Sequence, residues 1–349
     1  MFKLENLVRS NVLNMKPYSS ARDDFKGSAS IFIDANENNL GSLTGENYNR
    51  YPDPHQRELK SRIATIKGVK QEQIFLGNGS DECIDLLLRM VCRPGKDALL
   101  NLPPTYGMYE VSANLNEVRI DTVQLTADFQ IPVNKVLASV KPETKLIFIC
   151  SPNNPTGNSI DPESIETILD NFDGLVVLDE AYIDFANTPS WTTRLEEYPN
   201  LVVLQTFSKA WGMAGLRLGM AFASAEIIEL LDKIKPPYNI NQSTQELALK
   251  ALENDEQLKY MIEEIVQERE LLEKALPTLK AVEKVYPSDA NFLLVKVTDA
   301  NGLYKHLLND GIVVRNRSSL PGCENCLRIS IGTLEENQQL IQSISEFRT

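Results

Sequence analysis

Lys209 is the residue whose surroundings in the sequence most clearly suggest chemistry. It lies in the run Thr206-Phe-Ser-Lys-Ala-Trp-Gly-Met-Ala-Gly-Leu-Arg-Leu-Gly219, between apolar runs at Leu201–Gln205 and Leu218–Ala223 that predict two buried strands. Most lysines are solvated surface charges, but a lysine between two buried strands is poorly placed for that role. Its amine could instead form a Schiff base with a carbonyl compound.

Polar residues or glycines directly follow each predicted strand in this part of the chain. Besides Leu201–Gln205, the strands are Gln73–Leu76, Ala98–Leu102, Lys145–Cys150 and Leu175–Leu178. The segments that follow them are Gly77-Asn-Gly79, Pro103-Pro104, Ser151-Pro-Asn-Asn-Pro-Thr-Gly157, Asp179-Glu180 and Phe207-Ser208-Lys209. Parallel sheets place their ligands at the carboxyl ends of strands, so these loops should meet at one edge of a sheet.

Helical patterns alternate with these strands and supply a candidate anion site. Ser80–Val91 has an amphipathic pattern with Ser80 as the expected N-cap, and its amino end follows a glycine loop. Such an end is a suitable cradle for an anion. Asp161-Pro162 predicts the start of a second helix, and Ser243–Glu246 matches a capping box at the start of a third.

The order of the elements predicts an α/β protein with a mostly parallel sheet and a second, smaller domain. Residues 1–30 should form an N-terminal arm that packs with the small domain. Residues 31–238 should form the large domain, whose last helix ends at Pro236-Pro237. Residues 239–349 should form an α+β domain. Its predicted elements are a helix at Asp255–Leu276 and strands at Asn291–Val297, Ile312–Arg315 and Leu327–Ile331.

Composition disfavours several classes of function. The formal net charge is −13 and the isoelectric point is about 4.8, so we expect no nucleic acid as a partner. No run of the sequence approaches the roughly 18 apolar residues of a membrane span. The N-terminus lacks an apolar core, so a signal peptide is not expected. A local arginine cluster could still bind an anionic substrate.

The five cysteines are scattered, which favours reduced thiols and a cytoplasmic location. Cys323-Glu-Asn-Cys326 has the spacing of a metal-ligand pair, but a zinc site needs two further ligands. The only histidines are His55 and His306. We therefore expect a turn with incidental cysteines here, and no metal site.

The motifs around Lys209 occur in an order that resembles a known enzyme family. The fold-type I, class I/II aminotransferases that use pyridoxal 5′-phosphate have similar motifs to Ser151-Pro-Asn-Asn-Pro-Thr-Gly157, Asp179-Glu-Ala-Tyr182, Ser208-Lys209 and Gly215-Leu-Arg-Leu-Gly219. Four further motifs resemble those of the histidinol-phosphate aminotransferases: Asp34-Ala-Asn-Glu-Asn38, Arg50-Tyr-Pro-Asp-Pro54, Gly77-Asn-Gly-Ser-Asp-Glu82 and Leu327-Arg-Ile-Ser-Ile-Gly332. The resemblance covers nearly the whole chain. One departure is Asn39, where the family more often has proline.

The resemblance implies roles for the residues around the cofactor ring. Lys209 would hold the cofactor as a Schiff base and then move a proton between the substrate α-carbon and C4′ of the cofactor. Asp179 would pair with the pyridine nitrogen, and Tyr106 would stack on the ring. Asn154 and Tyr182 would hydrogen-bond the phenolic oxygen of the ring. Simpler interpretations are a loop or capping acid for Asp179, turn chemistry for Asn154 and core packing for Tyr106.

The resemblance also implies a site for the cofactor phosphate. The backbone amides of Ser80 and Asp81, the Ser208 hydroxyl and the Arg217 guanidinium would bind it. Tyr51 would reach the phosphate from a neighbouring subunit, so that a homodimer shares its active sites. The simpler interpretation of Tyr51 is an aromatic residue that anchors a turn.

For the substrate, the resemblance implies an arginine on a late strand. Arg328 would bind the α-carboxylate of glutamate and, in the other half of the reaction, the phosphate-bearing arm of histidinol phosphate. Tyr18, Asn36 and Asn154 are further candidate substrate contacts, and the N-terminal arm would close over the ligand. Arg315 would either add charge near the substrate phosphate or lie on the surface.

The implied activity is the exchange of an amino group between L-histidinol phosphate and 2-oxoglutarate, giving imidazole-acetol phosphate and glutamate. An aromatic aminotransferase and a lyase like threonine-phosphate decarboxylase are alternatives with the same fold. A pyridoxal-phosphate-binding regulator is disfavoured because no basic helix-turn-helix precedes the large domain. A nucleotide-binding α/β protein is disfavoured because neither GxGxxG nor GxxxxGK(S/T) follows a strand.

Overall fold

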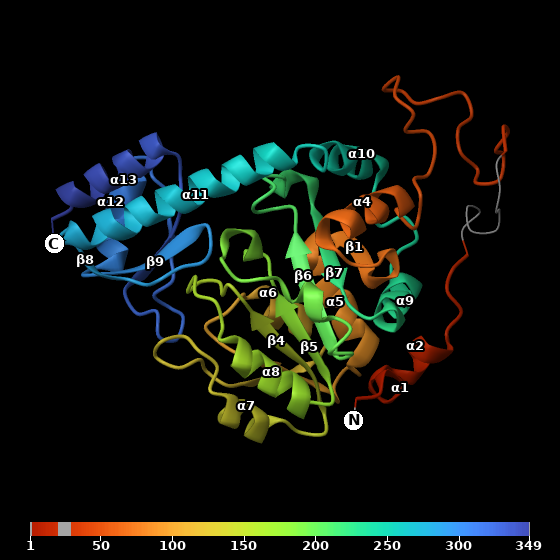
Figure 1. Ribbon diagram of the computed structural model, residues 1–349, viewed down its shortest axis with the longest axis horizontal. Coiled ribbons are helices and arrows are strands. Elements are labelled where there is room, and N and C mark those ends of the chain that lie inside the picture. Colours follow the sequence, from red (N-terminus) through yellow and green to blue (C-terminus); the bar gives the residue numbers. More distant parts are fainter. Residues whose placement is uncertain (1, 20–28, 349) are drawn as a thin grey trace.

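The computed structural model describes residues 2–19 and 29–348, and it has the α/β architecture expected from the sequence (Figure 1). Its main sheet has seven strands in the order β1-β7-β6-β5-β4-β2-β3. They are β1 (Ile74–Asn78), β2 (Ala98–Asn101), β3 (Arg119–Thr122), β4 (Thr144–Cys150), β5 (Leu175–Asp179), β6 (Leu201–Thr206) and β7 (Leu218–Phe222). β7 runs antiparallel to both of its neighbours and the other pairs are parallel, so the sheet is mostly parallel, as predicted.

The central strands are buried on both faces, which explains why they read as continuous apolar runs. In β5, Val176 and Leu178 belong to the core on one face of the sheet, and Leu175 and Val177 belong to the core on the other. The first face is covered by α4 (Arg57–Lys67), α7 (Val133–Ser139), α8 (Pro162–Asn171) and α10 (Gln242–Ala251). The second face is covered by α1 (Leu4–Leu7), α2 (Ser10–Asn14), α5 (Gly79–Val91), α6 (Met108–Leu115) and α9 (Ala225–Ile234).

The strand ends that were predicted to meet do lie together at one edge of the sheet. β4, β5 and β6 end at Cys150, Asp179 and Thr206, and Cys150 pairs directly with Asp179. β7 brings Gly219 against the start of α5, where a Cβ on Gly219 would lie 2.1 Å from the backbone nitrogen of Ser80. Only glycine allows this approach, so Gly219 lets α5 begin at the same edge.

Two of the three helix starts differ from the expected caps. α5 begins one residue before Ser80, with Asn78 in the N-cap position, so Ser80 lies inside the first turn. α10 is capped by Asn241, whose side chain accepts a backbone hydrogen bond two residues before the capping box at Ser243 would begin. Asp161 caps α8 as predicted. The chain passes from β1 into α5 almost without a loop, which leaves no room for a cap at Ser80.

The small domain is an antiparallel sheet packed against helices. Its strand order is β10-β11-β9-β8. These strands are β8 (Val282–Val285), β9 (Phe292–Val297), β10 (Arg315–Asn316) and β11 (Cys326–Ser330), and the helices are α11 (Asp255–Ala275), α12 (Ala300–Asn309) and α13 (Leu334–Glu346). The strand predicted at Ile312–Arg315 is observed only at Arg315–Asn316, so it begins later and is shorter than predicted. Ile312 and Val314 pack into the core of this domain before pairing with β11 begins at Arg315.

The two domains are joined through α11, and not at the boundary expected near residue 238. α10 packs on the large domain, because Ile240, Ala248 and Leu252 belong to a core of the large sheet. α11 then runs from that core to the core of the small domain, which contains Leu272 and Leu276 (Figure 1). Among the helices of residues 2–19 and 29–348, none is long and apolar enough to cross a membrane.

The described start of the N-terminal arm packs on the large domain, so its predicted packing with the small domain is wrong. Leu4, Leu7, Val8 and Val12 are buried in the same core as α5 and α9. The backbone amide of Arg9 donates a hydrogen bond to the carbonyl of Met90 at the end of α5, with an N–O distance of 3.0 Å. The apolar side chains of α1 and α2 therefore pack against α5 and α9. Figure 1 shows the start of the chain far from α12 and α13.

Candidate active site

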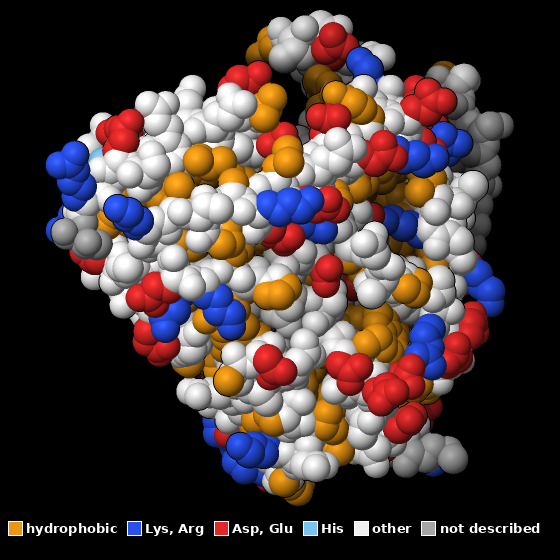
Figure 2. All heavy atoms as spheres, turned by 60° about the vertical axis from the view of Figure 1, so that its left-hand side comes forward, with side chains coloured by type: hydrophobic (Ala, Val, Ile, Leu, Met, Phe, Trp, Pro, Cys, Tyr) orange, Lys and Arg blue, Asp and Glu red, His pale blue; other side chains and the backbone are white. Residues whose placement is uncertain are grey.

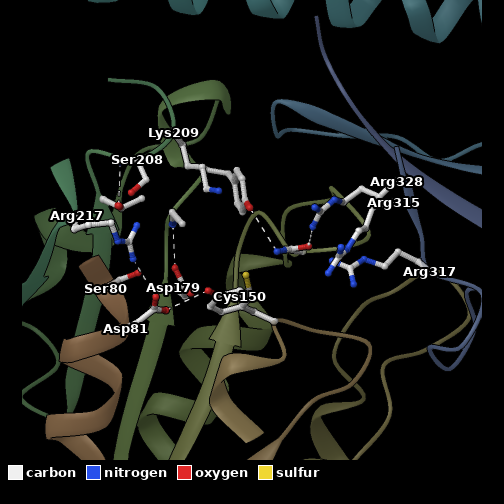
Figure 3. A pocket seen from close by; sticks show the side chains of 15 residues that line it. Ser80, Asp81, Cys150, Asp179, Ser208, Lys209, Arg217, Arg315, Arg317 and Arg328 are labelled. Carbon is white, nitrogen blue, oxygen red and sulfur yellow. Dashed lines mark hydrogen bonds and ion pairs between the residues drawn. The ribbon is translucent and has the colours of Figure 1, made fainter. Parts of the chain in front are cut away.

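A cavity of about 380 Å³ lies where the carboxyl edge of the large sheet faces the small domain (Figure 3). Its walls come from the loops after β4, β5 and β6, the start of α5, and strands β10 and β11. Most of the predicted site residues line it: Ser80, Asp81, Tyr106, Asn154, Asp179, Tyr182, Ser208, Lys209, Arg217, Arg315 and Arg328. Four lining residues were not predicted from the sequence: Cys150, Ala181, Thr206 and Arg317.

Lys209 follows β6 in a tight turn and extends into this cavity (Figure 3). Its Nζ lies 5.4 Å from the centroid of the Tyr182 ring. Burial lowers the pKa of Lys209 and the positive charge of Arg328 lowers it further, whereas the carboxylate of Asp179 raises it. A lowered pKa leaves more of the amine neutral near pH 7, and the neutral amine is the nucleophilic form.

Asp179 is a buried carboxylate at the end of β5, on the floor of the cavity. It accepts hydrogen bonds from the Tyr109 hydroxyl (2.6 Å) and from the Ala181 amide (3.1 Å). Burial raises the pKa of Asp179, while these two hydrogen bonds lower it. Asp179 caps no helix, and its position suits a carboxylate that pairs with a cation inside the cavity.

Asn154 links the two sides of the cavity. Its Nδ2 donates to the hydroxyl of Tyr182 at 3.4 Å, and its Oδ1 accepts from Nη1 of Arg328 at 2.5 Å. The hydrogen bonds that shape the surrounding loop come from the neighbouring Asn153, whose side chain donates to the carbonyl of Pro104. The side chain of Asn154 therefore does not stabilise the turn, and it lines the cavity. Burial raises the pKa of Tyr182, so its hydroxyl stays protonated and can donate.

The start of α5, Ser208 and Arg217 form a cradle of hydrogen-bond donors on the large-domain side (Figure 3). The Gly79 amide donates to the carbonyl of Arg217 at 2.6 Å, which fixes the helix start beside the arginine. Nη2 of Arg217 lies 3.3 Å from a carboxylate oxygen of Asp81. A Cβ on Gly79 would lie 2.7 Å from the same Nη2, so the glycine makes room for the guanidinium. Helix N-termini with an arginine bind phosphate groups well.

Tyr106 forms part of the cavity wall between Asp81 and Tyr109. Its hydroxyl donates to a carboxylate oxygen of Asp81 at 3.1 Å. Its ring meets the ring of Tyr109 edge-on, with centroids 5.5 Å apart. Tyr109 in turn stacks on Phe148, so the position of Tyr106 is fixed by packing on its far side. The structure thus gives Tyr106 both a packing contact and a face toward the cavity.

Three arginines line the small-domain side of the cavity. Figure 3 shows Arg315, Arg317 and Arg328 on the side opposite Arg217 and Ser208. The guanidinium carbon of Arg328 lies 5.3 Å from the centroid of the Phe292 ring. Burial lowers the pKa of Arg328, although arginine stays charged at any physiological pH. A cluster of this kind can bind anionic groups of a substrate.

Three predicted site residues do not line the cavity within one chain. Tyr51 is 51% exposed and stacks on Tyr238 with ring centroids 4.5 Å apart. Tyr18 is 72% exposed, and Asn36 is also exposed. All three lie in segments that flank the body of the large domain. A role for them needs either a movement of these segments or a second copy of the chain.

The cysteine pair is a turn, as predicted. Cys323 and Cys326 are both buried and free, and the Cys326 amide donates to the Cys323 carbonyl at 2.9 Å. Both pack against Phe129 and Leu294 in a small apolar cluster. Their role in the described part of the chain is therefore packing.

Two residues with side chains at the site had only weak signals in the sequence. Tyr109 lies three residues after Tyr106, a spacing that places both on one side of a helical turn. Arg317 lies two residues after Arg315, which is the spacing of one face of a strand. Neither residue belongs to the motifs that carried the resemblance, so nothing singled them out before the strands were placed.

Comparison with known proteins agrees with the geometry. Residues 21–344 match the family described as Aminotransferase class I and II. The histidinol-phosphate aminotransferases of Parabacteroides distasonis and Cytophaga hutchinsonii are 55% and 53% identical to this chain, and the alignments cover 100% and 99% of both chains, respectively. A solved histidinol-phosphate aminotransferase from Sinorhizobium meliloti, in complex with pyridoxal-5′-phosphate, is 26% identical with a TM-score of 0.79, over 89% of each chain. With its lysine, carboxylate and arginines gathered in one cavity, the chain belongs to the class I and II aminotransferases.

Proposed function

We propose that this aminotransferase acts on L-histidinol phosphate and 2-oxoglutarate and forms imidazole-acetol phosphate and glutamate. The observation that carries the proposal is one cavity that Lys209, Asp179 and Arg328 line together. The identity of the substrate is inferred from the full-length similarity of this chain to enzymes named histidinol-phosphate aminotransferase. The reaction would be a step of histidine biosynthesis.

Pyridoxal 5′-phosphate is the proposed cofactor, and the residues present fit it. The donors around the start of α5, Ser208 and Arg217 suit its phosphate, and Gly79 leaves the space that the guanidinium needs. Asp179 is a buried carboxylate facing the cavity, so a protonated pyridine nitrogen would supply the cation that it lacks. When bound, this cofactor supplies an electron sink for the carbanion that forms at the substrate α-carbon.

Lys209 is proposed to hold the cofactor and then to carry the proton at the substrate α-carbon. Its amine lines the cavity beside the Tyr182 ring, and burial lowers the pKa of Lys209, which favours the neutral amine. A neutral amine can accept a proton from the α-carbon and return it to a different carbon, which is general acid–base catalysis. Tyr182 and Asn154 are proposed to donate hydrogen bonds to the ring oxygen of the cofactor. Tyr106 is proposed to stack on the ring.

Arg328 is proposed to bind the acidic group of both substrates. It extends into the cavity from β11 and already bonds to Oδ1 of Asn154, so it is held in a fixed position near Lys209. A planar guanidinium binds a carboxylate or a phosphate with two parallel hydrogen bonds. One arginine can therefore serve glutamate in one half of the reaction and histidinol phosphate in the other.

A homodimer with shared active sites is proposed from the segment before α4. Figure 1 shows this segment extending away from the body of the large domain. It exposes large apolar side chains, namely Ile31, Ile33, Leu40 and Leu43. A second copy of the chain would bury them and would bring Tyr51 to the phosphate cradle of its partner. Tyr18 and Asn36 would reach a substrate in the same assembly. A cytoplasmic location is proposed because all five cysteines are free.

Steady-state assays with three amino donors test the proposed substrate. Histidinol phosphate should have a much higher kcat/KM than phenylalanine, with 2-oxoglutarate as the acceptor. Threonine phosphate should give no decarboxylation. Negligible turnover of histidinol phosphate would contradict the proposal, and rapid turnover of phenylalanine or loss of carbon dioxide from threonine phosphate would favour one of the two alternatives.

A further inference from the structure

The three arginines of the small domain lie on one face of a strand pair. Arg315 on β10 is directly opposite Arg328 on β11. Arg317 continues the same ladder, because its amide donates to the carbonyl of Cys326 at 2.9 Å. Side chains two residues apart on a strand share a face, so Arg317 lies beside this pair. Like charges directly opposite each other destabilise a sheet, so this arrangement calls for a compensating anion.

The described residues supply no carboxylate to this cluster. None of the ion pairs between residues of the described chain involves Arg315, Arg317 or Arg328. The two carboxylates of the cavity, Asp81 and Asp179, lie on the large-domain side, and Asp81 already pairs with Arg217. The positive cluster is also a local feature, because Figure 2 shows Lys and Arg interspersed with Asp and Glu over the face it draws.

Arg317 differs from Arg328 in that its own donors lack partners. Arg328 bonds to Asn154 and packs on the Phe292 ring. By contrast, Nε of Arg317 is buried and has no hydrogen-bond partner within the described chain, although the residue lines the cavity. Burial lowers the pKa of Arg317, and the charges of Arg328 and Arg315 lower it further. The Nη atoms of Arg317 are the donors that a ligand in the cavity can reach, and no hydrogen bond within the described chain occupies them.

A phosphate monoester can use this additional donor, whereas a carboxylate cannot. A carboxylate carries one negative charge, and a single arginine can occupy both of its oxygens. A phosphate monoester carries a charge of about −1.5 to −2 near pH 7 and offers three acceptor oxygens. After Arg328 has bound two of these oxygens, one oxygen and part of the charge remain for a further guanidinium.

We propose that Arg317 is a specificity-determining residue that binds the phosphate of the substrate and contributes little to the binding of a carboxylate. The inference rests on the proposed function for the identity of the phosphate substrate. It assigns different tasks to neighbouring arginines. Arg328 binds the acidic group of either substrate, and Arg317 distinguishes the phosphate from the carboxylate. The same enzyme can then process both substrates in turn and still select the phosphate compound among amines that lack one.

The test compares the holoenzyme with its Arg317→Gln and Arg317→Lys variants in the two half-reactions. In Arg317→Gln, kcat/KM for histidinol phosphate should fall by about tenfold to a hundredfold, the usual effect of one charge-assisted hydrogen bond. The value for glutamate should change by less than about twofold, because the carboxylate is bound by Arg328. Arg317→Lys should recover part of the loss, since it keeps the charge. Arg348→Gln, which removes an exposed arginine of the same domain, is the matched control.

Inorganic phosphate gives a readout that does not depend on the proposed substrate. It should inhibit the glutamate half-reaction of the holoenzyme competitively, and its inhibition constant should rise about tenfold in Arg317→Gln. Inhibition of the unaltered enzyme should also strengthen as the pH rises through the second ionisation of inorganic phosphate, which lies close to neutral pH. If histidinol phosphate is not a substrate but this shift occurs, the proposed function fails and the role of Arg317 stands. Equal losses for both substrates, or an unchanged inhibition constant, would overturn the inference.

Discussion

The least expected residue of the site is Tyr109, whose hydrogen bond favours the ionised form of Asp179. It is fully buried, and its hydroxyl donates the shortest hydrogen bond to Asp179, at 2.6 Å. Burial raises the pKa of Asp179, and this hydrogen bond is the largest influence that lowers it. Tyr109 contacts Asp179 without lining the cavity, so it positions the carboxylate and opposes the rise in its pKa that burial causes.

Replacing Tyr109 by phenylalanine should therefore make Asp179 harder to ionise. The pKa of Asp179 should rise in the variant, so the ionised form is lost at a higher pH as the pH falls. The acid limb of the kcat profile should move to higher pH, and kcat near pH 7 should fall by about tenfold. A kcat profile between pH 5 and 9 measures this, with the exposed Tyr260→Phe as the matched control. An unmoved acid limb would show that Tyr109 is only a packing residue.

At the scale of elements, the strands that are buried on both faces can be predicted from the sequence, whereas the strands with few buried residues cannot. β4, β5 and β6 were predicted within one or two residues because each is a continuous apolar run. β3 (Arg119–Thr122) was missed because it is an edge strand with polar, partly exposed residues. β10 was predicted too early because the apolar residues Ile312 and Val314 pack into the core of the small domain without pairing with a strand.

The site residues divide in a similar way into those that the sequence motifs identify and those that they do not. Residues in motifs at the ends of central strands, such as Asp179 and Lys209, were placed correctly in the cavity. Tyr109 and Arg317 lie outside those motifs, so only the packing of α6 and the pairing of the residue after β10 with β11 reveal them. Tyr51 lies outside the cavity of its own chain, because its predicted role requires a second copy of the chain.

The contact between β7 and α5 should be sensitive to a single methyl group. In Gly219→Ala, the new Cβ would lie 2.1 Å from the Ser80 nitrogen and would push the start of α5 away from Arg217. We expect the dissociation constant for pyridoxal 5′-phosphate to rise about tenfold or more, measured by fluorescence titration of the apoenzyme. Gly215→Ala is the matched control, because its Cβ would meet nothing within 4 Å. Equal affinities in the two variants would contradict the proposed phosphate cradle.

Glu180 should make the stability of the loop after β5 dependent on pH. It accepts hydrogen bonds from Ser190, from the Trp191 amide and from Gln205, which tie this loop to β6. Burial raises its pKa from 4.5 to about 7, so the folded state favours the protonated acid. The stability gained from that proton is present below pH 4.5 and is lost as the pH rises to about 7.

The change is measured by urea unfolding of wild type and Glu180→Gln at pH 5 and pH 8. The variant cannot lose a proton, so its stability relative to wild type should increase by about 1–3 kcal/mol between the two values. Glu226→Gln, at an exposed position on α9, should show no such trend. A constant difference between wild type and Glu180→Gln would mean that the carboxyl group is already ionised at pH 5.

At the scale of the whole molecule, two domains form the cavity and a third contribution is expected from a second chain. α11 connects the two cores. The large domain supplies Lys209 and Arg217 to the cavity, and the small domain supplies Arg315, Arg317 and Arg328. Tyr51 and the exposed apolar side chains before α4 lie outside this arrangement. The proposed homodimer would account for both.

Mixed dimers test whether Tyr51 acts across the subunit boundary. Tyr51→Ala and Lys209→Ala should each have very low activity alone. After the two variants are dissociated and allowed to reassociate together, about a quarter of the sites should contain both native residues if Tyr51 comes from the partner. Lys209→Ala mixed with Asp179→Ala should recover nothing, because both residues belong to one chain. The absence of recovery in the first mixture would count against a shared site.

The central claim is that the amine of Lys209 holds the cofactor and performs the chemistry. Reduction of the protein loaded with pyridoxal 5′-phosphate by borohydride, followed by peptide mass spectrometry, tests it most directly. Reduction fixes the cofactor permanently to the lysine that holds it. We expect the label on Lys209, in the peptide that contains Ser208 and Trp211, and no label in Lys209→Ala. A label on another lysine, or a protein that carries no label after reduction, would contradict it.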